Sequence, residues 1–148
     1  MSLKGRIRND MKTALKAGER DRLKVIRLIL AAVKQQEIDQ RGELDDAAVL
    51  GVIDRMVRQR RDSVSQFRQG GRQDLVDAES AEIEILEDYL PEPLSQAELD
   101  AAIGEAIAET GAEGVRDIGK VMGRLKTKVQ GRADMGAVAT AVKSRLGR

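Results

Sequence analysis

Apolar residues recur at helical spacing along almost the whole chain, and this periodicity limits the fold more than any other feature. The first stripe consists of Leu3, Ile7, Met11 and Leu15, one helical turn apart. No segment alternates apolar and polar residues for long enough to predict a strand. With one Tyr, one Phe and no Trp, the core must be built from aliphatic residues and Met, which suit helix packing. We therefore predict an all-α protein.

The two prolines of the chain, Pro91 and Pro93, lie together in "YLPEPLS" and indicate extended backbone there. A chain of 148 residues can form one ordinary domain or two small ones. We predict two helical domains, an N-terminal four-helix unit over residues 1–90 and a C-terminal three-helix module over residues 91–148.

Capping residues and glycines define the helices of both predicted domains. In the first, we expect helices over residues 3–17, 21–41, 46–67 and 73–90, with Ser2 and either Asp45 or Asp46 as caps and Gly18 and Gly42 as stops. In the second, Ser95 and Glu98 have the spacing of a capping box, and Gly111 ends that helix. The last two helices should begin at Asp117 and Asp134.

The composition removes most catalytic chemistry. Without Cys or His there is no thiolate nucleophile and no imidazole base, and the commonest metal ligands are missing. The Asp and Glu residues are mostly scattered among Lys and Arg at helical spacings, which is typical of solvated helix faces. We predict no catalytic residue, no metal site and no cofactor.

Charge is divided into blocks, although the net charge is only +1. Residues 55–72 are strongly basic, and residues 73–90 contain seven acidic and no basic side chains. We interpret the patch of Arg55, Arg58, Arg60 and Arg61 as part of an ion-pair network with this acidic fourth helix. In the second domain, residues 91–115 are acidic and residues 116–148 are basic.

Helical geometry places Lys120, Arg124 and Lys128 on one side of the sixth helix, opposite its apolar stripe. This basic ridge is either a phosphate-contacting surface or an ordinary polar face. The candidate RNA-binding residues are Lys120, Arg124, Lys126, Lys128, Arg132, Lys143 and Arg145. Gly119 and Gly123 destabilise the same helix, and we interpret them as sites of close packing against the seventh helix.

Several segments resemble the GatB/YqeY family, and in particular its stand-alone YqeY-like proteins: "RLILAAVK", "EIEILEDYLPEPLS", "DIGKVMGRL" and "GRADMGAVATAVKSRL". The resemblance covers essentially the whole chain and implies an all-helical, two-domain protein. The C-terminal part is similar to the tail domain of the B subunit of the tRNA-dependent amidotransferase, where the tail helps hold tRNA. The resemblance therefore implies contact with tRNA and does not imply the kinase or amide-transfer step. Many family members have Gly directly after the Asp of the joint, whereas Met135 follows Asp134 here.

We expect a non-catalytic protein that contacts tRNA or another structured RNA. One alternative is an adaptor that docks on a translation-related protein. A second is an accessory of carbon–nitrogen ligase activity with glutamine as the amide donor, which the absent nucleotide loop, His and Cys disfavour. No run of about 18 apolar residues and no apolar signal-peptide core is present, so we expect a cytoplasmic location and no membrane partner.

Overall fold

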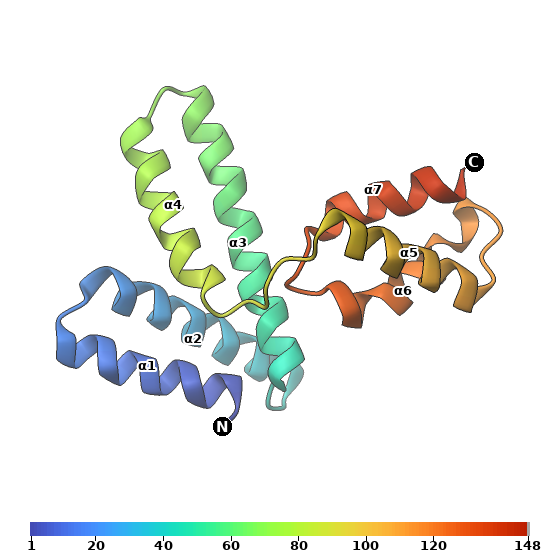
Figure 1. Cartoon of the computed structure of the whole chain (residues 1–148). Coiled ribbons are helices and arrows are strands. Elements are labelled where there is room, and N and C mark those ends of the chain that lie inside the picture. The colour runs from blue at the N-terminus through green and yellow to red at the C-terminus, as the bar shows by residue number, and fades with distance from the viewer. Residues whose placement is uncertain (148) are drawn as a thin grey trace. The chain divides into compact units, whose positions relative to one another are not determined.

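The computed structural model describes residues 1–147, which contain seven α-helices and one 3-10 turn but no strand. The all-α prediction is confirmed. The chain divides into two compact units, Met1–Leu90 and Pro91–Arg148, which we call the N-terminal and C-terminal units (Figure 1). Each unit has its own cluster of buried aliphatic residues. No helix in the described part of the chain is both long and apolar enough to cross a membrane.

The N-terminal unit consists of two helical hairpins (Figure 1). The first pairs α1 (Leu3–Ala17) with α2 (Arg20–Gln40), and the second pairs α3 (Asp46–Gln69) with α4 (Gln73–Glu87). Helix α2 packs against α1, α3 and α4, because its apolar residues surround much of its circumference. The largest fully buried side chains of this unit are Ile7, Ile26, Ile29, Ile53 and Leu86.

In the N-terminal unit the predicted N-terminal caps form, whereas two of the predicted helix ends are wrong. Ser2 caps α1 by accepting a hydrogen bond from a backbone N–H group, as predicted, and Asp45, one of the two residues predicted for this role, caps α3 in the same way. Helix α2 ends at Gln40, and Arg41 caps it in the left-handed conformation with φ 56°, one residue before the predicted stop at Gly42. Helix α4 ends at Glu87, before the predicted residue 90, because Pro91 disfavours helical backbone at the residue preceding it. After Glu87 the N–H groups of Tyr89 and Leu90 bond to carbonyls three residues back, as in turns, and not four residues back as in an α-helix.

One residue of the predicted apolar stripe of α1 is misplaced. Leu15 is 59% exposed, whereas Ala14 is buried. The stripe drifts around the helix because one turn takes 3.6 residues and not four, so the fourth member of an i, i+4 series leaves the buried face. Leu3 and Met11 remain partly buried against the core.

The C-terminal unit contains α5 (Gln96–Thr110), a 3-10 turn (Val115–Asp117), α6 (Ile118–Val129) and α7 (Met135–Leu146). The capping box of Ser95 and Glu98 forms in full, and Gly111 ends α5 in the left-handed conformation, as predicted. Asp134 caps α7. The core of this unit contains Ile103, Ala106, Val121, Leu125, Val129, Val138, Val142 and Leu146.

Candidate nucleic-acid interface

The exposed face of α6 holds the residues from which the basic ridge was predicted. Val121, Leu125 and Val129 face the core and are fully buried. Lys120 and Arg124 lie on the opposite side, with side chains 71% and 60% exposed. The core of the C-terminal unit therefore fixes which face of α6 meets the solvent.

Gly119 and Gly123 are exposed on this face, and they do not pack against α7. A Cβ atom built at either glycine meets no neighbouring atom within 4 Å. Our interpretation of these glycines as packing sites is wrong, because they lie on the side of α6 that is turned away from the core. Each costs the helix about 1 kcal/mol relative to Ala, with no contact inside the unit in return.

Gly119, Gly123 and Thr127 follow one another at intervals of one helical turn and form a line of small residues along exposed α6. We call this line the α6 furrow. Lys120, Arg124 and Lys128 follow one side of the furrow at the same interval, and Lys126 lies on its other side. A partner that enters the furrow could approach the helix backbone closely with positive charge on both sides.

Acidic residues pair with the ridge on α6. The Arg124 Nε atom lies 2.7 Å from Glu109 of α5, and Lys128 Nζ lies 3.3 Å from Glu105. Lys120 is near Asp117, at 3.9 Å. The hydrogen bond from Arg124 holds the pKa of Glu109 below its usual value, which favours the ionised carboxylate. Exposed pairs of this kind contribute at most about 1 kcal/mol each, so a phosphate can compete for the same cations.

Two of the other candidates hold the C-terminal unit together. Arg132 Nε donates to the carbonyl of Glu92 at 2.9 Å, and Arg145 donates to the carbonyl of Asp100 at 2.8 Å. Both bonds connect the region of α5 to the last third of the chain. The side chains of Lys126 and Lys143 are exposed and form no hydrogen bond or ion pair with residues 1–147. The seven candidates thus differ in what they do within the fold.

The arginine patch of α3 is largely neutralised within the N-terminal unit. Arg60 pairs with Glu82 at 3.0 Å, and Arg61 pairs with Glu87 at 2.9 Å. Both partners belong to α4, which confirms our interpretation for these two residues. Arg58 lies 3.8 Å from Asp54 of its own helix, and Arg55 is exposed.

Sequence reasoning missed the polar cluster around Tyr89, the one tyrosine of the chain. Its side chain is 4% exposed, and its hydroxyl donates to Asp10 of α1 at 2.6 Å. The Arg6 guanidinium lies over the ring, 5.1 Å from its centroid. Burial raises the pKa of Tyr89 above its usual value, and the bond to Asp10 adds to this effect. This cluster joins the start of the chain to the end of α4 and has a structural role.

The described residues offer no obvious setting for metal chemistry. Within residues 1–147, no three His, Cys, Asp or Glu side chains are grouped closely enough to hold a metal ion. The ionisable groups near α6 instead form cation–carboxylate pairs.

Comparison with known proteins identifies relatives along nearly the full sequence. A family model described as "Yqey-like protein" matches residues 4–146. Three fungal relatives share the name "Altered inheritance of mitochondria protein 41, mitochondrial". The protein of Lachancea thermotolerans is 37% identical over 70% of this chain and 57% of its own length. That of Pyrenophora tritici-repentis is 30% identical over 86% and 71%, and that of Kluyveromyces lactis is 35% identical over 70% and 57%. The chain thus spans little more than half the length of two of these relatives.

The names of these relatives overturn our prediction of a cytoplasmic location, because all three are described as mitochondrial. The prediction was wrong because it depended on the absence of an apolar signal-peptide core. Mitochondrial targeting uses amphipathic segments rich in Arg and Ser, for which that absence is no test.

Proposed function

Because this chain belongs to the Yqey-like protein family, we propose that its C-terminal unit is a non-catalytic module that contacts tRNA or a related structured RNA through the α6 furrow. The single observation that carries this proposal is the pair of exposed glycines beside the basic ridge. Gly119 and Gly123 weaken α6 although a Cβ atom at either position would meet no neighbour, and Lys120 and Arg124 lie next to them on the same face. A need for close approach by a partner explains their presence better than packing does.

Electrostatics and size support a phosphate backbone as the partner. Lys and Arg neutralise phosphates, and a helix without side chains at two positions lets the sugar–phosphate chain come close. Residues 91–148 contain no Phe, Tyr or Trp, so bases have no aromatic surface on which to stack. We therefore expect the module to recognise RNA by shape and backbone, with little preference for base sequence.

The carboxylates of α5 set the strength of this contact. In the free protein, Glu105 forms an ion pair with Lys128 and Glu109 forms one with Arg124. Phosphates would have to replace these carboxylates, which are exposed and contribute little to stability. The exchange lowers the affinity for short or weakly charged RNA and favours an RNA whose phosphates reach several cations at once.

The first test neutralises the ridge. We expect the triple variant Lys120→Gln, Arg124→Gln, Lys128→Gln to bind total tRNA more weakly, because fewer counterions are released on binding. For three phosphate contacts the slope of log affinity against log salt should be about 2 to 3 in magnitude in the parent, and it should fall towards zero in the variant. Fluorescence anisotropy with labelled tRNA between about 0.05 and 0.3 M salt measures both quantities.

A charge-matched control makes this first test specific. Arg27, Arg55 and Arg68 are exposed residues of the N-terminal unit without ion pairs in the described structure. Their joint replacement by Gln changes the net charge by the same amount and should leave the tRNA affinity within about twofold of the parent. Equal loss in both variants, or no binding by the parent at about 0.1 M salt, would reject the proposal.

The second test fills the furrow. We expect Gly119→Ala with Gly123→Ala to raise the free energy of unfolding by about 1 to 2 kcal/mol, since Ala favours helix and the added methyl groups meet no neighbour. The same variant should bind tRNA at least a few times more weakly, because the methyl groups keep the phosphate backbone away. A more stable protein with unchanged affinity would show that the glycines do not serve RNA contact.

A further inference from the structure

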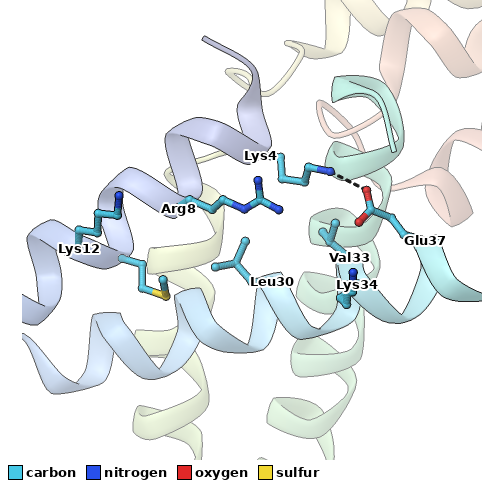
Figure 2. Close-up of a pocket in the computed structure, with 8 residues that line it drawn as sticks. Lys4, Arg8, Lys12, Leu30, Val33, Lys34 and Glu37 are labelled. Atoms are coloured by element: carbon cyan, nitrogen blue, oxygen red, sulfur yellow. Dashed lines mark hydrogen bonds and ion pairs between the residues drawn. The ribbon is translucent and has the colours of Figure 1, made fainter. Parts of the chain in front are cut away.

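A groove of about 240 Å³ lies between α1 and α2 in the N-terminal unit, on elements that the proposed RNA contact does not use. Its floor is apolar and is formed by Met11, Leu30 and Val33. Figure 2 shows the Arg8 side chain of α1 and the Leu30 side chain of α2 reaching into the space between the two helices. The groove is too small for a typical whole ligand, for which sites measure about 300 Å³ or more, but one large apolar side chain can enter it.

Positive charge surrounds this apolar floor. Lys4, Arg8 and Lys12 follow one another at one-turn intervals along α1, and Lys34 contributes from α2. Lys4 is satisfied by Glu37 at 2.7 Å (Figure 2), and Glu37 also accepts the backbone N–H of Leu44. This pair is largely shielded from solvent and closes one end of the groove.

The other three cations of the rim are Arg8, Lys12 and Lys34, whose side chains are exposed and form no hydrogen bond or ion pair with the described residues. The hydrogen bond from Lys4 is the main cause that lowers the pKa of Glu37, and the charge of Lys34 adds a smaller contribution. The ridge on α6 differs from these three cations, because Glu105 and Glu109 occupy its Lys128 and Arg124. The groove of the N-terminal unit is therefore a concentrated positive field beside an open apolar surface.

We propose that this groove is a docking site for an acidic amphipathic segment of a partner protein. One apolar side chain of the segment would rest on Met11, Leu30 and Val33, and its carboxylates would meet Arg8, Lys12 and Lys34. An amphipathic helix laid in a groove presents apolar anchors and charges at the one-turn interval at which the cations of α1 are spaced. Methionine suits such a floor because its flexible, polarizable side chain adapts to different partners.

The apolar floor favours a protein segment over the other polyanions. A phosphate backbone would place charged groups against Met11, Leu30 and Val33, where they lose hydration and gain no hydrogen bond. The groove also has no aromatic residue on which a base could stack. A membrane surface is flat on this scale, whereas the floor lies between two helices. An acidic segment with an apolar anchor satisfies both parts of the groove at once.

The test uses the full chain and a defined probe, a fluorescein-labelled helical peptide with Leu at i and i+4 and Glu at the flanking positions. We expect the parent to bind this peptide at about 0.05 M salt, and Arg8→Gln with Lys12→Gln to weaken binding about fivefold or more. The matched control, Arg55→Gln with Arg68→Gln, removes two unpaired exposed cations elsewhere in the same unit and should leave the affinity within about twofold. A second peptide with Ser in place of Leu should lose most of its affinity, because it cannot use the floor.

Four outcomes would overturn the proposal. Equal binding by the parent and the Arg8→Gln, Lys12→Gln variant would show that the peptide does not bind in the groove. Equal binding of the Leu and Ser peptides would show that only a general attraction between charges is at work. Tighter binding of polyuridylate or of phosphatidylserine vesicles than of the peptide, lost in the same variant, would assign the groove to RNA or to a membrane. If the parent chain dimerises in sedimentation experiments and the Arg8→Gln, Lys12→Gln variant does not, the groove would be assigned to a second copy of the chain. The ridge variant of α6 should bind the peptide normally, so this proposal and the RNA proposal can fail separately.

Discussion

At the scale of single residues, Tyr89 is the most informative side chain, because it joins two ends of the N-terminal unit. Its hydroxyl donates to Asp10 at 2.6 Å, and its ring lies under Arg6. A buried hydroxyl bonded to a carboxylate is a strong interaction, since removal of the donor leaves a charged acceptor without its partner. Because the Tyr89 hydroxyl must keep its proton to donate this bond, the stabilising contribution of the residue falls at alkaline pH.

We expect Tyr89→Phe to lower the free energy of unfolding by about 1.5 to 3 kcal/mol, because it removes a hydrogen bond to a charged group. Urea unfolding followed by circular dichroism measures the change. Burial raises the pKa of Tyr89 in the folded state. Its stabilising contribution is therefore complete below the ordinary pKa of about 10 and is lost as pH rises above that value. The parent should lose more stability than the Phe variant as the pH rises from about 9.5 to about 11.5, and parallel losses would contradict this account.

At the scale of elements, the start of α5 shows how local chemistry sets a helix boundary. The Ser95 hydroxyl accepts the N–H of Glu98, and the Glu98 carboxylate accepts the N–H of Ser95. Pro93 prevents the helix from extending towards the N-terminal unit. Leu94, between them, donates its N–H to the carbonyl of Arg132 at 2.8 Å, which ties this boundary to the joint before α7.

We expect Ser95→Ala to destabilise the C-terminal unit by about 1 kcal/mol, because one N–H group at the start of α5 loses its acceptor. Thermal unfolding followed by circular dichroism measures the change. Ser144→Ala is the matched control, since Ser144 is exposed on α7 and its hydroxyl forms no hydrogen bond within residues 1–147; it should change stability by less than about 0.5 kcal/mol. Similar effects of both substitutions would show that the capping box contributes little.

At the scale of the whole molecule, the two clusters of buried residues share no member. We expect residues 1–90 and residues 91–148 to unfold cooperatively as separate fragments, because each has a complete core and the proline segment adds little burial. Denaturation of both fragments and of the full chain tests this expectation. Ser95→Ala should shift only the transition of the 91–148 fragment. A fragment that unfolds without cooperativity would show that the two parts depend on one another for stability.

The sequence by itself determined the helices, most of their caps and the family, because these depend on residues close together in the chain. Ser2, Asp45 and Ser95 cap helices through N–H groups three residues away, and Gly18 and Gly111 end them through their own backbone freedom. The one-turn periodicity also placed Ile7 in the core correctly. The exposed Leu15 and the early end of α4 mark the limit of such local reasoning.

Only the tertiary structure decided what the charged and small residues contact, because their partners lie far away in the sequence. Periodicity showed that Arg124 and Lys128 face away from the core, but only the packing of α5 on α6 brought Glu109 and Glu105 to them. The same holds for Gly119 and Gly123, whose spacing suits helix packing and exposure equally well until the neighbours are known. The groove between α1 and α2 exists because the two helices of one hairpin lie side by side, with Arg8, Lys12 and Lys34 around Met11, Leu30 and Val33. Such a site depends on distances in space, which a one-dimensional pattern does not contain.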